Sequence, residues 1–375
     1  MDLRGRAHRA LTLARFGALA SSRAHPQAAG PSTEWRGRLT AARGGTQPGR
    51  MTHSPIALRT PEDLALACPL MLGYWPEGSV CVILVDSEDH VVLIMRWERD
   101  ADVVLPAIPV AATGAGSPVA VHLVVFATVD GAPQPLHPMA WQRSADALRE
   151  SGLPLGRTLA VARTAEGVMW TSAEGPLHEP GVHMIPTSVV ADVATRWGMP
   201  AWHESRSDYV ADIAPDPDAR AEVERALTDL PRLIEAERDQ AITRIRELLD
   251  EHSLSPMEMA EVLQGLADVR VRDTLLWDLM QDGPHAWSTH ADRLAQAVAA
   301  SPDGSVAPAA TLLAILRWQL GDGSRARAAV ERARAADPGY SLAGLVDRCL
   351  ATGLHPAMWR AGLEDLSREA CRRAA

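Results

Sequence analysis

The sequence predicts an α+β protein in which an N-terminal mixed-sheet α/β domain is followed by an all-helical C-terminal domain. Two patterns carry this prediction. Before about residue 186, continuous apolar runs rich in β-branched residues alternate with short polar turns, which is typical of buried strands. After that point, apolar residues recur every three to four positions, which is typical of amphipathic helices. A chain of 375 residues is also long enough for two separate hydrophobic cores.

The front half, residues 56–212, is predicted to form a mixed sheet. A first helix over 61–68 begins at Thr60, where a hydroxyl residue precedes a proline and two acids. Because hairpins pair strands antiparallel, whereas intervening helices permit parallel pairing, both kinds of pairing are expected. The strands are expected at 79–85, 90–96, 119–128, 158–163 and 167–171, with a weakly helical stretch over 99–112 and a helix over 139–151.

The back half, residues 213–375, is predicted to be helical throughout, after a helix over 187–197. Helix starts are marked at Asp216 and Ser255, and Pro231 should kink or divide the helix that begins near 217. Small residues at Ala326 and Ala333 give the spacing of a tetratricopeptide-like helix hairpin, and we expect one packed hairpin rather than a peptide-binding array. The helix that starts at Ser255 should turn Val262, Leu263 and Leu266 inward, and further helices are expected near 271–281, 286–300, 308–320, 325–336 and 341–351.

Charge is distributed unevenly along the chain. Residues 1–50 hold nine arginines against Asp2 and Glu34, a net of +7, so the rest of the chain carries −17 to give the total of −10. We expect residues 1–55 to be a disordered, arginine-rich leader. The abrupt change of character favours Met51 as the true start, with residues 1–50 not translated; a transit peptide of similar composition is the alternative.

The composition argues against several classes of protein. No apolar run approaches the roughly 20 residues that span a bilayer, and an acidic body argues against nucleic-acid binding. The four cysteines form no C-x-x-C pair, and no glycine-rich nucleotide loop occurs. We therefore expect a cytoplasmic protein with reduced thiols, no cofactor and no metal. All 37 basic residues are arginine, which indicates a GC-rich genome.

Several short motifs occur in order along the chain. They are LGYWPEGSV at 72–80, Arg96 at the end of the second strand, VRVRD at 269–273, GDG at 321–323 and DPGY at 337–340. Together they resemble the family of domain of unknown function 4192 (DUF4192), from Thr60 to about Trp359. The resemblance implies an actinobacterial source and an intact two-part architecture, but no activity and no catalytic residues. Glu98 stands where the family usually has aspartate, a mild departure.

The best candidate for a ligand site is loop 73–79 together with the end of the second strand. Gly73 and Gly78 permit unusual backbone angles, and Ser79 offers a hydroxyl group. Arg96, with Glu98 two residues on, could hold a small anion. If the hairpin forms, the start of its first strand and the end of its second lie side by side. The alternative is that the loop only shapes a turn, in which Arg96 pairs with a nearby glutamate.

Other polar groups are weaker candidates. The segment 203–208 contains the serine, histidine and acid of a nucleophilic triad, but a solvated helix start explains it as well. His285 and His290 are five apart, which is not the spacing of a helical zinc pair. Arg272 and Asp273 are expected to form a structural ion pair at a helix start.

Three functions remain open from the sequence, and it does not decide whether the protein is an enzyme. The first is a non-enzymatic regulatory or scaffold protein that meets a protein partner through its helical domain. The second is an enzyme or sensor that binds a small anionic ligand near Gly73, Ser79 and Arg96, since ligands of α/β sheets gather at strand ends. The third, nucleic-acid binding through the arginine-rich leader, has the least support.

Overall fold

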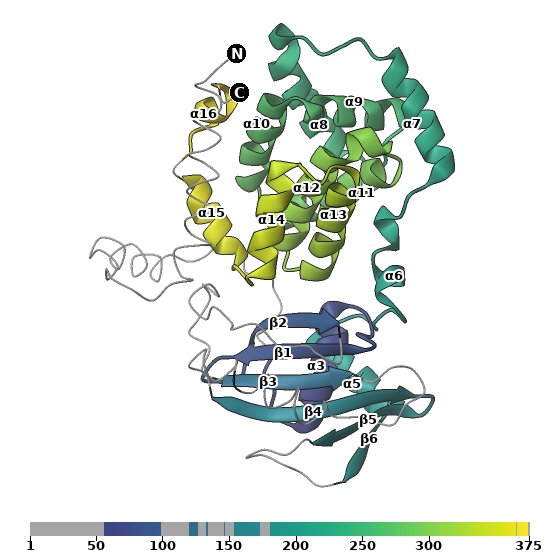
Figure 1. The fold of residues 1–375 in the computed structure, drawn as a ribbon, viewed down its shortest axis with the longest axis vertical. Coiled ribbons are helices and arrows are strands. Elements are labelled where there is room, and N and C mark those ends of the chain that lie inside the picture. Colours follow the sequence, from purple (N-terminus) through teal and green to yellow (C-terminus); the bar gives the residue numbers. More distant parts are fainter. Residues whose placement is uncertain are drawn as a thin grey trace, which may run out of the picture.

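The computed structural model describes residues 56–98, 120–126, 133, 146, 154–172, 181–364 and 366–373. These residues form a sheet followed by a helical half, as predicted, although the sheet has six strands rather than the five expected. The two halves are stacked along the longest axis of the molecule (Figure 1). The leader over 1–55, the stretch 99–112 and all but one residue of the predicted helix over 139–151 lie outside the described residues.

The sheet is mixed, as the sequence predicts. Its order is β2-β1-β3-β4-β5-β6, and of these five pairings β3–β4 is parallel while the other four are antiparallel. The two predicted hairpins, β1–β2 and β4–β5, are both present. The strands are β1 (Ser79–Val85), β2 (Val91–Glu98), β3 (Ala120–Phe126), β4 (Leu155–Thr164), β5 (Gly167–Ser172) and β6 (Val182–Pro186).

The edge strand β6 was not predicted. It has five residues, and its side chains alternate in burial, with Val182 65% exposed, Met184 41% exposed and Ile185 buried. An alternation this short gives a weak periodic signal, which is why the pattern of the sequence missed it.

Both faces of β1 are buried, and this explains its continuous apolar sequence. One face packs beneath α3 (Pro61–Leu72) and α5 (Thr187–Trp197), where Leu66 and Val193 belong to the same hydrophobic cluster. The opposite face belongs to a second cluster that includes Leu123 of β3. The alternating side chains of β1 divide between them, Cys81, Ile83 and Val85 in the first, and Val80, Val82 and Leu84 in the second.

Helix α3 begins where the sequence predicts, with a complete capping box. Thr60 Oγ1 accepts from the Asp63 N–H at 3.1 Å, and Asp63 Oδ2 accepts from the Thr60 N–H at 3.2 Å. Asp63 Oδ1 also accepts from Arg196 of α5 at 3.0 Å, which ties the two covering helices together. The helix runs to Leu72 rather than ending at 68, because it accommodates Pro69 in its interior.

The first prediction tests this cap. We expect Thr60→Ala to lower the free energy of unfolding by about 1 kcal/mol, because the Asp63 N–H loses its partner at the helix start. Thr228→Ala is the matched control, since its hydroxyl bonds the Glu224 carbonyl within a helix, and its effect should stay within about 0.5 kcal/mol. Chemical denaturation measures both; equal losses for the two variants would contradict the role of the cap.

The helical half follows the predicted pattern closely. Pro231 divides the chain as expected, since α7 ends at Asp229 and the next α-helix begins at Arg238. Helix α12 begins earlier than predicted, with Pro308 inside it. The elements are α6 (Arg206–Tyr209), η2 (Ala211–Ile213), α7 (Pro217–Asp229), η3 (Glu235–Glu237), α8 (Arg238–Asp250), α9 (Pro256–Ala267), α10 (Val269–Met280), α11 (Pro284–Ala299), α12 (Asp303–Gln319), α13 (Gly323–Ala336), α14 (Ser341–Ala351), α15 (Pro356–Glu364) and α16 (Arg368–Arg373).

One hydrophobic cluster holds these helices together, from Ile213 to Leu363. Helices α12 and α13 form a close hairpin, in which Ala326 and Ala333 are fully buried. Its likeness to a tetratricopeptide hairpin stays a prediction, as does the domain boundary at residue 212. None of the described helices combines the length and apolar character needed to cross a bilayer.

Candidate functional site

Loop 73–79 joins α3 to β1 and lies against the connection to the helical half. Gly73 caps α3 with φ +80°, and its N–H donates to the Pro69 carbonyl at 3.1 Å. A Cβ atom at this position would lie 2.3 Å from Cε2 of Tyr209. Position 73 therefore requires glycine both for its backbone angle and for the ring beside it. Gly78, with φ +57°, also takes a left-handed angle.

The hairpin brings Ser79 and Arg96 together. Arg96 Nε donates to Ser79 Oγ at 2.8 Å, and Ser79 Oγ donates to the Glu77 carbonyl at 3.0 Å. Ser79 is fully buried, so its hydroxyl serves this local network. Glu98, the register partner of Ser79 at the end of β2, is exposed.

Tyr74 of the same loop is buried between the two halves. Its ring lies 5.8 Å from that of Tyr209, and the Arg96 guanidinium lies 5.9 Å from its centroid. The Ser324 side chain at the start of α13 lies near its phenol. Burial raises the pKa of Tyr74, although the charges of Arg96 and Arg206 oppose the shift. The phenol therefore stays protonated at neutral pH.

Tyr209, the last residue of α6, contacts both halves. Its hydroxyl donates to Asp322 Oδ2 at 3.0 Å, and Asp322 is the N-cap of α13. Arg325 of the same helix stacks over the Tyr209 ring at 4.2 Å and donates from Nε to the Tyr209 carbonyl at 3.1 Å. Burial, followed by the charge of Asp322, raises the pKa of Tyr209 far above its ordinary value. We call Tyr74, Arg96, Tyr209, Asp322 and Arg325 the junction.

Segment 203–208, the weaker triad candidate, connects the halves through its backbone and charges. The His203 N–H donates to the Gly73 carbonyl at 2.8 Å, and the Trp75 N–H donates back to the His203 carbonyl at 3.0 Å. Arg206 pairs with Glu331 of α13 at 2.8 Å. Ser205 caps α6 by accepting from the Asp208 N–H at 3.2 Å, in a capping box that fits the helix-start interpretation of this segment.

A second motif cluster lies within the helical half. Arg272 pairs with Asp273 at 2.6 Å, as expected, and also donates to the Tyr340 hydroxyl. The Arg272 guanidinium lies 5.5 Å from the Tyr340 ring centroid. Burial raises the pKa of Tyr340, and the charge of Arg272 acts against it. The VRVRD motif of α10 is thereby joined to the DPGY turn that precedes α14.

Sequence reasoning missed Tyr209 and Arg325, although one signal pointed to the first of them. The chain has three tyrosines, Tyr74, Tyr209 and Tyr340. Two of them lie within the motifs, and the third lies against both GYWPEG and GDG. The rarity of tyrosine therefore marks the residues that join separate motifs.

Metal-ligating residues do not gather anywhere in the described chain, where no group of three or more His, Cys, Asp or Glu side chains is placed to hold an ion. His290 is buried, and its Nε2 lies 2.8 Å from Asp250 Oδ1, an interaction between helices. The cysteines are all free and buried, and burial raises the pKa of Cys68 and Cys349. Their thiols are therefore weak nucleophiles.

A family model described as "Domain of unknown function (DUF4192)" matches residues 61–357. The match spans both halves and includes every motif at the junction and at the Arg272 cluster. Neither a curated protein nor a solved structure matches the chain.

Proposed function

The chain belongs to the DUF4192 family, a domain of unknown function, and from its junction we propose a non-enzymatic, cytoplasmic regulatory or scaffold protein whose two halves act as one unit. The observation that carries the proposal is Tyr209, which packs on Gly73 of the sheet half and bonds Asp322 of the helical half. Four free, buried cysteines suit a reducing compartment. The all-arginine basic composition suits the actinobacterial source that the motifs imply.

The polar groups of the junction are arranged as structural donors and acceptors. Burial keeps both phenols protonated, so neither acts as a base, and the Tyr209 phenol donates a hydrogen bond to Asp322. The Ser79 hydroxyl is buried and already donates to a carbonyl while it accepts from Arg96. A nucleophile needs access and an activating base, and these contacts favour a structural role instead.

The partner that we propose is a protein with a basic face. Residues 213–375 hold 26 acidic residues and 19 arginines, a net of −7. A net negative charge on the helical half attracts a positively charged protein and speeds the encounter. The α12–α13 hairpin, which we propose to be tetratricopeptide-like, gives that surface a fixed shape.

The second prediction tests whether the halves act as one unit. We expect wild-type protein to unfold in a single thermal transition, and Tyr209→Ala to separate it into two, because the ring shared by both halves is lost. Tyr209→Phe keeps the ring and removes the bond to Asp322, so it should lower stability by about 1 kcal/mol without splitting the transition. Differential scanning calorimetry distinguishes the two; a single transition in Tyr209→Ala would contradict the coupling.

The scaffold role is tested by affinity capture with the full chain from a native lysate. We expect capture of a basic protein that is released as salt rises, and weaker capture by Tyr209→Ala than by Tyr209→Phe. Failure to retain any protein reproducibly, or capture that is insensitive both to salt and to the junction variant, would count against the role.

The anion-binding alternative keeps one specific observation in its favour. The Arg96 guanidinium lies 5.9 Å from the Tyr74 ring centroid, and the charge of Arg206 also acts on the Tyr74 phenol, so two guanidinium groups influence this loop. A thermal-shift screen with small anions tests it. A ligand-induced rise in melting temperature that disappears in Arg96→Ala would favour this function over the scaffold.

A further inference from the structure

A pocket in the helical half lies apart from the junction. Its volume is about 370 Å³, within the range of small-molecule sites. It is formed where η3, α8 and α10 meet α16, and Figure 1 shows α16 at the end of the helical half that is far from the sheet. The lining residues are Glu235, Arg238, Asp239, Ile242, Arg270, Thr274, Glu369, Arg372 and Arg373.

The residues that line this pocket carry a net positive charge, whereas the helical half around them carries a net negative charge. Four of the lining residues are arginines and three are acids, a net of +1. The helical half as a whole carries a net of −7. A local excess of guanidinium groups in an acidic domain favours an anion over a cation.

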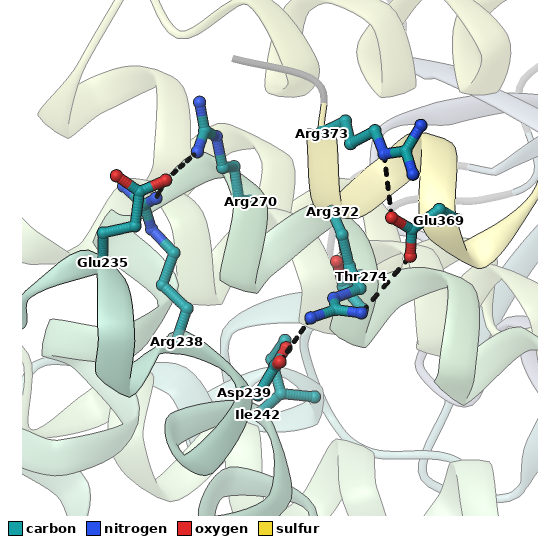
Figure 2. A pocket seen from close by; sticks show the side chains of 9 residues that line it. All are labelled: Glu235, Arg238, Asp239, Ile242, Arg270, Thr274, Glu369, Arg372 and Arg373. Atoms are coloured by element: carbon teal, nitrogen blue, oxygen red, sulfur yellow. Dashed lines mark hydrogen bonds and ion pairs between the residues drawn. The ribbon is translucent and has the colours of Figure 1, made fainter.

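The guanidinium groups are held in two ion-pair groups, which Figure 2 shows side by side. In the first, Glu235 Oε1 lies 2.7 Å from Arg270 Nη1 and 2.9 Å from Arg238 Nη1. In the second, Arg372 pairs with Asp239, and Glu369 pairs with Arg372 at 3.3 Å and with Arg373 at 2.8 Å. The acids thus fix the arginines in place before any ligand arrives.

Three buried donors among the lining residues have no hydrogen-bond partner. They are the Oγ1 of Thr274, a fully buried residue, the Nε of Arg270, and the Nη1 of Arg238, whose contact with Glu235 at 2.9 Å is an ion pair only. An unmade hydrogen bond at a buried donor is costly. Arg270 also lies in the first turn of α10, where the helix dipole disfavours a positive charge. An oxyanion would offset both costs, since it accepts hydrogen bonds and carries negative charge.

We propose that this pocket binds a small molecule bearing a phosphate group. A guanidinium fork matches a phosphate with two parallel N–H···O bonds, and the several oxygens of one phosphate can accept from arginines of both ion-pair groups. The site is separate from the junction, so it stands whether or not the proposed scaffold role holds.

The third prediction is that the full chain binds inorganic phosphate saturably in isothermal titration calorimetry at constant ionic strength. Arg270→Gln and Arg372→Gln should each weaken binding by about tenfold, because each loses a charge-assisted bond. Glu235→Gln should instead strengthen it, because the carboxylate that competes for Arg238 and Arg270 is gone.

Matched variants locate the ion. Arg244→Gln removes an arginine of α8 that pairs with Glu261 at 3.0 Å outside the pocket, and it should bind phosphate like wild type. Arg270 and Arg372 belong to different ion-pair groups. If one of the two variants fails to fold, the other still tests whether phosphate binds in the pocket.

Three results would overturn the site. They are no saturable phosphate binding by wild type, undiminished binding by the folded Arg270→Gln or Arg372→Gln protein, and tighter binding of citrate than of phosphate. Loss of binding in Arg96→Ala with retention in the pocket variants would also overturn it, and would place the ion at the junction instead.

Discussion

Gly73→Ala is expected to lower the free energy of unfolding by about 2–5 kcal/mol. A left-handed backbone costs a non-glycine residue about 1–2 kcal/mol, and crowding a packed site adds about 1–3 kcal/mol. Here φ is +80° and the new methyl group would lie 2.3 Å from the Tyr209 ring. That ring cannot move freely, because Asp322 and Arg325 hold it from the helical side.

The matched control for this prediction is Gly304→Ala in α12, where an added Cβ meets nothing within 4 Å and the backbone is helical. It should be neutral or stabilise by up to about 1 kcal/mol. Combining Gly73→Ala with Tyr209→Ala removes the clash but keeps the backbone strain, so the two losses should not add. Denaturant titration of wild type, the three single variants and the double variant measures this; a Gly73→Ala protein as stable as wild type would show that the junction is not packed as described.

Arg272→Ala is expected to lower the free energy of unfolding by about 2–4 kcal/mol. Removing one partner of a buried, hydrogen-bonded charge leaves the other uncompensated, which costs about 3–5 kcal/mol when both are buried. Arg272 is 11% exposed at its side chain, while Asp273 is 31% exposed and keeps some hydration, so the expected loss is about 1 kcal/mol smaller than for a fully buried pair. The Tyr340 hydroxyl loses its donor as well.

Two variants sharpen the Arg272 prediction. Arg244→Ala removes an arginine that pairs with Glu258 and Glu261 at the surface, where such pairs contribute less than about 1 kcal/mol. Arg272→Lys keeps the charge but loses the planar group that stacks on Tyr340, so it should restore only part of the stability. Thermal unfolding at neutral pH ranks the variants; similar melting temperatures for Arg272→Ala and Arg244→Ala would contradict the buried role.

Elements with strong local signals could be predicted almost to the residue. Strand β1 and helices α5 and α14 have the predicted bounds. The predicted helix bounds were wrong where packing in the folded protein offset an unfavourable local residue. The helix expected over 61–68 stopped before Pro69 and the one expected over 308–320 started at Pro308, yet both prolines lie inside helices. A missing N–H costs one hydrogen bond, and a helix face buried against the core offsets that cost.

The candidate site was predictable in part. The hairpin places Ser79 beside Arg96, because antiparallel pairing of adjacent strands sets the start of one against the end of the next. No local rule connects this corner to Tyr209 or Asp322, which lie more than a hundred residues further along the chain. The sequence therefore indicated the loop, but could not show that the loop meets the helical half.

The sequence by itself determined the two-part architecture, most of its strands and helices, the mixed sheet and the family, because periodicity, caps and motifs are local properties of the chain. Only the tertiary structure shows that the LGYWPEGSV loop, Arg96 and the GDG turn meet around Tyr209. It alone also shows that Arg270 and Arg372 line the same pocket. The physical reason is that contacts between distant segments depend on how helices and sheet pack, and a pattern of neighbouring residues does not encode that packing directly. The loop that the sequence offered as a ligand site also packs, in the folded chain, against Tyr209, which bonds the helical half.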